Sequence, residues 1–335
     1  MRPPMWILAS AILIAPAGES LLSKPGVGAV SLSQPQQDRP LFSVKSELVL
    51  LSVTVKDKKN EHLTGLPKEA FTVFDNGQAQ PIRFFLSEDA PVTIGLLIDN
   101  SGSMLPNRPL VIAAAAAFAE TSNPQDDIFA LAFNEEVHAA LTTESPFTND
   151  PIVLRDALQR AVTTRGRTAL YDAIVRGLEY VDQGSHDRKV LVIVSDGSDN
   201  ASTAGFEQVL HQIQSSNVVV YAVGLIDPIE MDTKPKRLKE LAEATGGELF
   251  RPANSKQVTE VLQRIAREIR HTYVLAYEPE AVRVAGLRRI RVSVRPPDSR
   301  KLVVRTRAGY LSPTSETKPP EIDATELEDT TVHGR

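Results

Sequence analysis

The spacing of apolar residues changes twice along this chain, and the changes divide it into three regions. Between Phe42 and Phe85 apolar and polar residues alternate, which predicts β-strands with one buried face. Asp75-Asn76-Gly77 lies between two such runs and predicts a tight turn. Alternation returns between Tyr273 and Tyr310. Both ends of this part of the chain are therefore expected to form antiparallel β-structure.

The middle region, from Val92 to Arg270, alternates short continuous apolar runs with segments of helical periodicity. This pattern predicts an α/β fold with a doubly wound, mostly parallel, Rossmann-like sheet and one antiparallel edge hairpin. Strands are expected at Val92–Asp99, Ile128–Phe133, Val137–Leu141, Val190–Ser195, Val218–Gly224 and Glu248–Arg251. Helices are expected at Met104–Glu120, Pro151–Val162, Leu170–Val181, Phe206–Gln214, Arg237–Ala244 and Val258–Arg270.

The two β-rich flanks are each too short to form a stable sheet with a core of its own. In the second flank, strands are expected at Tyr273–Tyr277, Ile290–Val294 and Leu302–Thr306, with the region ending at Gly309-Tyr310. We therefore expect the N- and C-terminal segments to pair into one flanking β-sandwich, with the α/β domain inserted into it. Two separate small β units are the alternative.

Candidate chemistry lies where two of the apolar strands end. The run Ile94–Ile98 leads into Asp99, followed at alternate positions by Ser101 and Ser103, and a later apolar run ends at Ser195-Asp196-Gly197. The carboxyl ends of parallel strands meet at one edge of a sheet, where ligands bind. Oxygen side chains without nearby His or Cys suit a hard cation, Mg²⁺ or Mn²⁺, rather than zinc. Thr168 precedes an apolar helical pattern and is assigned to the same site.

The motif D-x-S-x-S, a later Thr and a later S-D-G resemble the metal-ion-dependent adhesion site of von Willebrand factor type A (VWA) domains. The resemblance extends roughly from Pro91 to Arg270. It implies that Ser101, Ser103 and Thr168 are direct or near-direct metal ligands. Asp99 and Asp196 would bind the metal directly or through water. It also implies that an Asp or Glu of a partner protein completes the coordination. We expect no enzymatic activity.

Several of these residues have alternative structural roles. Ser103 or Thr168 could cap a helix, and Asp196-Gly197 could be a simple turn. Asp172 is expected on a helix face beside the site rather than as a ligand, and Asp199 and Asn200 are expected to start the next helix.

One alternative function is a scaffold in which the metal merely rigidifies the loops. An aspartate-based phosphatase would resemble D-x-D, whereas here the third position is Ser101, and the general acid that such enzymes need is missing.

The order of the three regions resembles the VWFA-related Acidobacterial-type proteins, a family of secreted bacterial proteins. The residues that carry this resemblance are the adhesion-site motifs together with Gly65-Leu66-Pro67, Phe71-Thr72-Val73, Asp75-Asn76-Gly77, Tyr273 and Tyr277, and Arg307-Ala308-Gly309-Tyr310. The resemblance implies a layout more than a specific activity.

Composition narrows the functional classes. The 335 residues are 42% hydrophobic and carry a formal net charge of −5, with Lys and Arg spread along the chain. No basic footprint for nucleic acid is present, and the run Arg288-Arg289-Ile290-Arg291 is interpreted as a solvated sheet face. The chain has no cysteine, so a protein outside the cytoplasm would fold without disulfides.

The N-terminus has the features of a secretory signal: Arg2, an apolar run from Met5 to Ala17, and small residues at Ala15 and Ala17. An uncleaved membrane anchor is the alternative. We therefore expect a secreted or periplasmic protein without an integral membrane span after cleavage. The expected segments are a signal peptide 1–17, a flexible linker 18–40, a β segment 41–88, the VWA domain 90–270, a second β segment 271–312 and a disordered tail 313–335.

Overall fold

The computed structural model describes residues 48–87, 89–161, 166–225, 235–279, 286–296, 298 and 301–312. The expected signal peptide, linker and tail lie outside the described residues. Among the described residues, no helix combines the length and the apolar character needed to span a bilayer.

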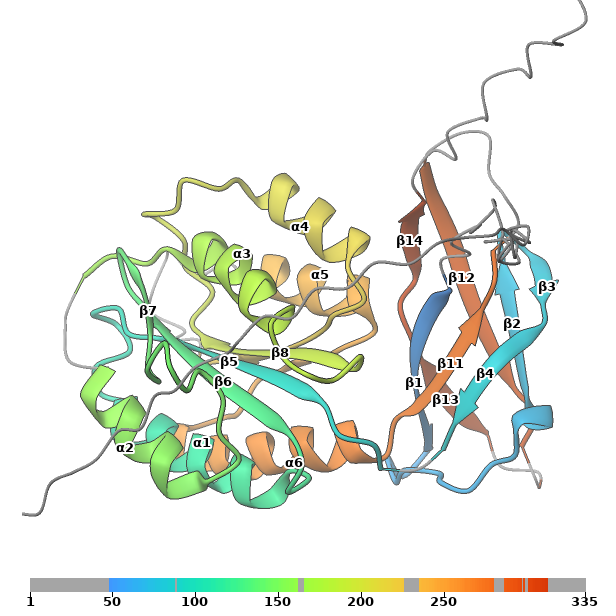
Figure 1. The fold of residues 1–335 in the computed structure, drawn as a ribbon, viewed down its shortest axis with the longest axis horizontal. Helices are drawn as coiled ribbons and strands as arrows, with labels where there is room; N and C mark the ends of the chain where they lie inside the picture. The colour runs from blue at the N-terminus through green and yellow to red at the C-terminus, as the bar shows by residue number, and fades with distance from the viewer. Residues whose placement is uncertain are drawn as a thin grey trace, which may run out of the picture. The chain divides into compact units, whose positions relative to one another are not determined.

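The central element is a six-stranded sheet with the order β10-β9-β8-β5-β6-β7 (Figure 1). Neighbouring strands are parallel except for the edge pair β6 and β7. The strands are β5 (Thr93–Asp99), β6 (Asp127–Phe133), β7 (Val137–Ala139), β8 (Lys189–Ser195), β9 (Val219–Gly224) and β10 (Leu249–Phe250). The expected α/β fold class is confirmed.

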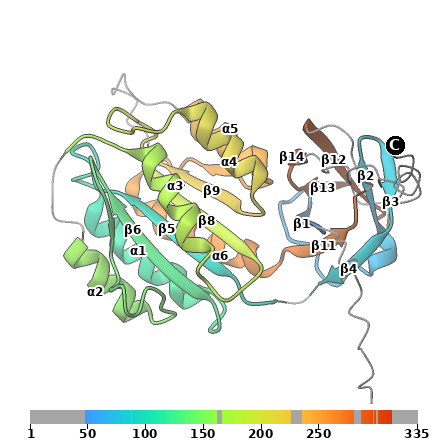
Figure 2. The same ribbon diagram turned by 45° about the horizontal axis from the view of Figure 1, so that its top comes forward.

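Helices cover both faces of this sheet, which explains why its central strands are continuous apolar runs. One face packs against α1 (Arg108–Thr121), α2 (Pro151–Ala161) and α6 (Val258–Arg270). The other packs against α3 (Leu170–Val181), α4 (Phe206–Ser215) and α5 (Pro235–Thr245). The two helical layers are visible on opposite sides of the sheet in Figures 1 and 2. A short 3₁₀ helix, η2 (Ser255–Gln257), precedes α6.

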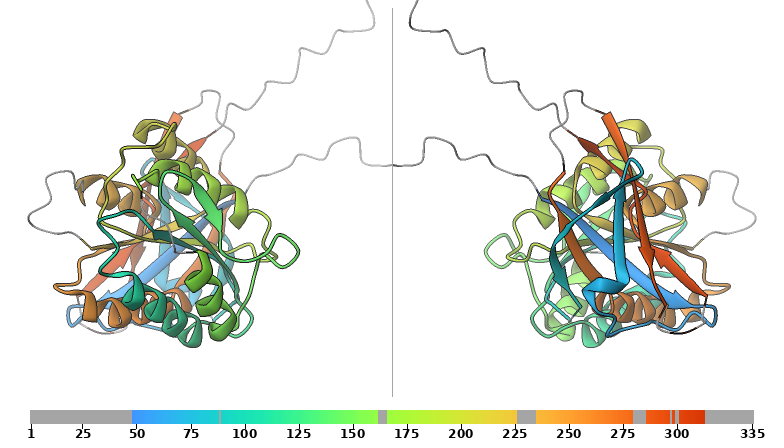
Figure 3. Two further views of the ribbon diagram at one scale, coloured as in Figure 1. Left: turned by 90° about the vertical axis from the view of Figure 1, so that its left-hand side faces the viewer. Right: turned by 90° about the vertical axis from the view of Figure 1, so that its right-hand side faces the viewer.

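The flanks together form two four-stranded sheets, with the orders β13-β1-β11-β4 and β14-β12-β2-β3. Their elements are β1 (Val49–Asp57), η1 (Lys68–Ala70), β2 (Phe71–Asp75), β3 (Gln78–Gln80), β4 (Ile82–Leu86), β11 (Tyr273–Tyr277), β12 (Gly286–Val294), β13 (Leu302–Arg305) and β14 (Gly309–Ser312). N-terminal β1 pairs with C-terminal β11 and β13, and N-terminal β2 pairs with β12. Figure 3 shows the blue and orange strands side by side. The shared sandwich is confirmed.

A buried carboxylate, Asp75, lies at the polar centre of the sandwich. Its Oδ2 accepts hydrogen bonds from the hydroxyls of Tyr277 at 2.8 Å and Tyr310 at 3.2 Å. Its Oδ1 accepts one from Arg288 Nε at 2.9 Å. Asp75 is 1% exposed, so these three donors replace the water that it loses. Residues of three motifs that are far apart in the sequence therefore meet at one carboxylate.

The α/β domain is inserted into the sandwich, so the chain segment that enters it must lie close to the segment that leaves it. Two arginines hold these segments together. Arg188, the residue directly before β8 in the sequence, donates to Ala90 O at 2.5 Å and to Ile269 O at 2.7 Å. Arg270 donates from Nε to Asp89 Oδ2 at 2.7 Å. Both residues therefore connect the segment before β5 to the end of α6.

Charged side chains also connect the sandwich to the α/β domain. Glu268 of α6 is fully buried and pairs with Lys56 of β1 and Arg305 of β13. Burial lowers the pKa of Lys56 to about 8. Arg307 donates to Ser216 O at 2.9 Å and Gln214 O at 2.6 Å, at the C-terminal end of α4. A cation is favourable at that end of a helix because unpaired carbonyls gather there.

Several sequence-based boundaries were wrong. Helix α1 begins at Arg108 instead of Met104, because residues 101–107 form turns. Asp199 and Asn200 do not start a helix, since α4 begins at Phe206. Gly309-Tyr310, at which the strands of the second flank were expected to end, instead starts β14, which pairs with β12 within the expected segment 271–312.

Removing the carboxylate of Asp75 should destabilise the sandwich. Asp75→Ala leaves Arg288 without its partner and two buried hydroxyls without an acceptor, so we expect the free energy of unfolding to fall by about 3–5 kcal/mol. Chemical denaturation of the full chain measures this. Asp156→Ala, whose side chain is 46% exposed, is the control and should change stability by less than about 0.5 kcal/mol. Equal stability of the two variants would contradict the role given to Asp75.

Candidate functional site

The candidate site lies at the carboxyl edge of the parallel sheet, where β5 and β8 end side by side. The two strands pair in parallel from Thr93 with Lys189 to Ile98 with Val194. Asp99 is the last residue of β5, and Ser195 is the last residue of β8. This register places Asp99 next to Ser195 and brings Asp196 to the same edge.

Hydroxyl groups connect the two carboxylates. Ser195 Oγ donates to Asp99 Oδ2 at 2.6 Å, and Ser101 N donates to Asp99 Oδ1 at 2.8 Å. Ser101 Oγ lies 3.1 Å from Ser103 Oγ, and Ser103 Oγ donates to Asp196 Oδ2 at 2.5 Å. Four of the five candidate ligands, Asp99, Ser101, Ser103 and Asp196, therefore belong to one hydrogen-bonded cluster.

The fifth candidate, Thr168, is held beside this cluster by backbone hydrogen bonds. Gly102 N donates to Gly166 O at 3.2 Å, which joins the D-x-S-x-S loop to the Thr168 segment. Thr168 N donates to Asn200 Oδ1 at 2.8 Å, and Thr168 O accepts from Asn200 N at 2.9 Å. The segment is thus attached on one side to the loop after β5 and on the other to the loop after β8.

The cluster is buried except at one position. Asp99, Ser101, Thr168 and Asp196 are 1–3% exposed, whereas Ser103 is exposed. Burial raises the pKa of Asp99 to about 6, and the neighbouring charge of Asp196 acts in the same direction. Hydrogen bonds from Ser101 and Ser195 oppose this shift. A cation in contact with Asp99 would favour its ionised form.

The donor set fits a hard divalent cation. All five candidates offer oxygen, and their carboxylates and hydroxyls are the ligand types that Mg²⁺ accepts. Within the described part of the chain, His, Cys, Asp and Glu side chains do not gather in groups of three or more that could hold a metal ion. An ion at this site would therefore have to use hydroxyl oxygens or water in addition to Asp99 and Asp196.

Sequence reasoning missed Arg108, whose side chain donates hydrogen bonds to the loop after β5. The side chain is 9% exposed, and its Nη2 donates to Asn100 O at 2.6 Å and more weakly to Ser101 O at 3.4 Å. Nothing in the local pattern indicated this role, because an arginine at the first turn of a helix usually faces solvent. The contact depends on the turns that return the chain over the end of β5.

A second missed group organises the start of α3. Asp199 Oδ1 and Ser202 Oγ accept hydrogen bonds from Tyr171 N at 3.3 and 3.0 Å, and Ser202 Oγ also accepts from Asp172 N at 3.2 Å. Ala169 is the N-cap residue, without a side-chain cap of its own. The helix-capping interpretation of Thr168 was therefore wrong, since the cap comes from the loop after β8.

Asn134 was also missed, although its position directly after β6 could have indicated it. Its backbone O accepts from Ala169 N at 2.6 Å, and Phe133 O accepts from Asn100 N at 2.7 Å. The end of β6 therefore contacts both the Asp99 loop and the Thr168 segment. Three neighbouring strands contribute to the site, where the motifs had indicated two.

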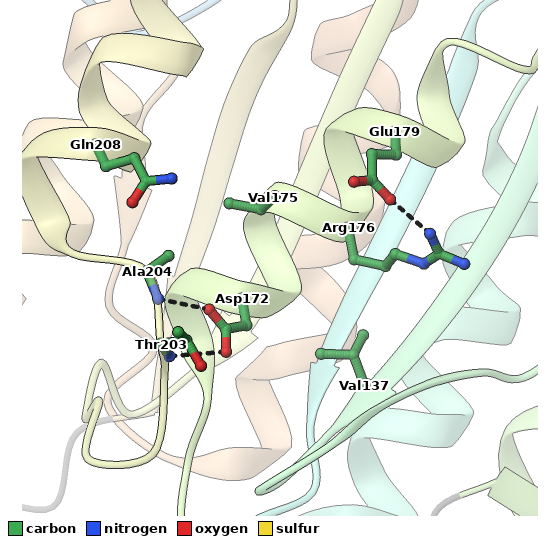
Figure 4. A pocket seen from close by; sticks show the side chains of 8 residues that line it. All are labelled: Val137, Asp172, Val175, Arg176, Glu179, Thr203, Ala204 and Gln208. Atoms are coloured by element: carbon green, nitrogen blue, oxygen red, sulfur yellow. Dashed lines mark hydrogen bonds and ion pairs between the residues drawn. The ribbon is translucent and has the colours of Figure 1, made fainter.

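Asp172, four residues after Thr168, lines a hollow of about 520 Å³ with its carboxylate toward Thr203 and Ala204 (Figure 4). Its two oxygens accept from Thr203 N at 2.9 Å and Ala204 N at 2.8 Å. Arg176, on the same wall, pairs with Glu179. The charged groups shown in the hollow therefore already have partners. The two contacts of Asp172 help to position the loop that follows Asp196.

Residues 93–264, just over half of the chain, match the von Willebrand factor type A domain. The chain therefore belongs to the VWA family. Domains of this family commonly serve in adhesion or protein binding. A comparison with curated proteins gave no match.

Solved structures similar to this chain include three bacterial proteins. A von Willebrand factor type A protein from Catenulispora acidiphila is 14% identical, with a TM-score of 0.47, over 80% of this chain and 75% of its own. An aerotolerance-related membrane protein from Bacteroides fragilis is 16% identical, with a TM-score of 0.41, over 53% and 99%. The vWF domain of the type V pili tip protein Mfa5 from Porphyromonas gingivalis is 15% identical, with a TM-score of 0.42, over 54% and 95%.

Replacing Arg108 should loosen the loop that carries the candidate ligands. Arg108→Met keeps the apolar stem but removes the donor to Asn100 O, so we expect a loss of about 1–3 kcal/mol in the free energy of unfolding. Hydrogen exchange at residues 100–104 should become faster. Arg155→Met, at a side chain that is 46% exposed on α2, is the control and should leave both quantities unchanged. Unchanged exchange in Arg108→Met would contradict the supporting role.

Proposed function

We propose that this protein is a divalent-cation-dependent, adhesion-type protein-binding module. Asp99, Ser101, Ser103, Thr168 and Asp196 would hold Mg²⁺ or Mn²⁺, and an Asp or Glu of a partner protein would bind the same ion. The observation that carries the proposal is the hydrogen-bonded chain from Asp99 through Ser101 and Ser103 to Asp196 at the carboxyl edge of the sheet.

The charges of the site support binding of an acidic partner. Two carboxylates balance the charge of a divalent ion formally, but serine and threonine hydroxyls add no further negative charge. Mg²⁺ commonly retains water in its octahedral shell, and an external carboxylate can replace such a water. The exposed position of Ser103 provides the side from which a partner would approach. The ion would attract the partner's carboxylate, and the protein would hold the ion at a fixed position.

We further propose that the protein acts outside the cytoplasm, secreted or periplasmic. The support is the signal-like apolar run from Met5 to Ala17. We propose no catalytic role: the D-x-S-x-S motif has Ser101 where aspartate-based phosphatases have a second carboxylate.

Metal binding should depend on Asp99. Asp99→Ala removes one of the two carboxylates in the cluster, so we expect the affinity for Mg²⁺ or Mn²⁺ in calorimetry to fall at least tenfold, about 1.4 kcal/mol. The control is Asp156→Asn, which neutralises a half-exposed carboxylate next to Arg155 on α2. Asp156→Asn should bind like the wild type. Equal affinities of wild type and Asp99→Ala would contradict the metal assignment.

Partner binding should require both the metal and an acidic partner residue. A partner obtained by pull-down with Mg²⁺ should be lost with EDTA, and also with Thr168→Ala or Asp196→Ala while circular dichroism stays native. Substituting the essential Asp or Glu of the partner should cost about 2–5 kcal/mol of binding free energy, as for one side of a buried charge pair.

Two outcomes would reject this prediction. If EDTA leaves the complex intact and no single acidic residue of the partner matters, the metal only rigidifies the loops and the protein is a scaffold. If partner binding survives Asp196→Ala, the binding surface lies elsewhere.

A further inference from the structure

The outer face of the sheet β14-β12-β2-β3 carries two exposed arginines. Because side chains alternate along a strand, Arg289 and Arg291 of β12 share the face opposite to the buried Ile290 and Val292. Arg289 and Arg291 are two residues apart, so their backbone positions are separated by about 6.6 Å along the strand. This is the Arg-rich run that the sequence had indicated as a solvated sheet face.

The neighbours of these arginines are uncharged. Across β12, Arg291 is in register with Phe74 and Arg289 with Gly309. The guanidinium carbon of Arg291 lies 3.9 Å from the centroid of the Phe74 ring, a cation–π contact between neighbouring strands. Within the part of the chain that the structure describes, neither guanidinium pairs with a carboxylate. Arg288, by contrast, faces inward and is neutralised by Asp75.

The chain also contains an acidic segment of matching spacing. Residues 321–329 read Glu-Ile-Asp-Ala-Thr-Glu-Leu-Glu-Asp and include no basic residue. Glu321 and Asp323, and again Glu326 and Glu328, are two residues apart. In an extended peptide that spacing repeats at about 6.6 Å, the same as the backbone spacing of Arg289 and Arg291 along β12. The five carboxylates carry a formal charge of −5, equal to the net charge of the whole chain.

The segment is within reach of the arginines. The last residue of β14, Ser312, is in register with Gly286 at the start of β12. Arg291 is five residues further along β12, about 17 Å away. The eight residues 313–320 can span up to about 27 Å. The tether is therefore long enough for residues 321–329 to lie across the face.

We propose that residues 321–329 bind in cis to the outer face of this sheet, with their alternate carboxylates on Arg289 and Arg291. The segment neutralises the two guanidiniums and keeps other anions off this face. The contact is electrostatic and solvent-exposed, so it weakens as salt is added. It is independent of the metal site and of the function proposed for it.

A cross-linking experiment tests this on the full chain, which has no cysteine of its own. Ser293→Cys places a thiol on the same face, two residues beyond Arg291, and Thr325→Cys places one within the acidic segment. The matched control pairs Thr325→Cys with Val303→Cys, a residue of β13 in the other sheet that is 57% exposed. Disulfide formation is followed under mild oxidation by non-reducing electrophoresis and intact mass.

We expect the Ser293→Cys pair to form an intramolecular disulfide at least fivefold faster than the Val303→Cys pair. Adding Arg289→Ser and Arg291→Ser, or 0.5 M NaCl, should remove the difference. Circular dichroism confirms that these surface variants fold. Equal rates for the two pairs, or a difference that survives the arginine substitutions, would overturn the proposal. Disulfide-linked dimers in place of the intramolecular product would show that the face binds a second copy and would overturn binding in cis.

Discussion

The parallel pairing of β5 and β8 is the constraint on which the candidate site depends. Both strands are buried on both faces, so helices must cover them and their polar ends must emerge together. Two carboxylates at one edge repel each other, and burial adds to this cost by raising the pKa of Asp99. The hydroxyls of Ser195 and Ser103 and the backbone N–H of Ser101 offset the loss of water by donating hydrogen bonds to these carboxylates. The arrangement suits a cation because its polar atoms already converge.

The supporting groups around the cluster come from loops that are distant in sequence. Asn200 holds Thr168, Asp199 and Ser202 cap α3, and Arg108 holds the turn after β5. Each of these contacts satisfies a backbone group that would otherwise be buried without a partner. The loops are therefore fixed by hydrogen bonds rather than by packing alone. A fixed set of loops is what a metal site needs to keep ligand positions within narrow limits.

The insertion of one domain into another imposes a second constraint. The sandwich closes only if Tyr273–Tyr277 returns to the strand that begins at Val49, after the whole α/β domain has been traversed. Arg188 and Arg270 hold the two connecting segments together, and Glu268 joins α6 to both Lys56 and Arg305. Breaking such a buried ionic cluster at one member leaves the others unpaired, which is costly. The end of α6 is therefore fixed to the sandwich.

Much of the fold followed from local patterns. Alternating apolar residues indicated the half-buried strands of the sandwich, whereas continuous apolar runs indicated the central strands, which helices cover on both faces. The bounds of α3, α6 and β11 were predicted as observed. The start of α1 was wrong because propensity cannot detect the turns between Ser101 and Asn107. β14 was missed because a four-residue strand ending in Ser carries little periodic signal of its own.

The sequence by itself determined the class of fold and the chemical identity of the candidate ligands. Both depend on residue type and short spacing: an apolar strand that ends in Asp99, and serines at alternate positions after it. Only the tertiary structure decided which groups support them. Asp199, expected to start a helix, instead caps α3. Asp75, expected only in a turn, accepts hydrogen bonds from Tyr277, Tyr310 and Arg288. These partners are 28 to 235 residues apart in sequence. Such contacts are set by how whole layers pack, and no local pattern encodes that.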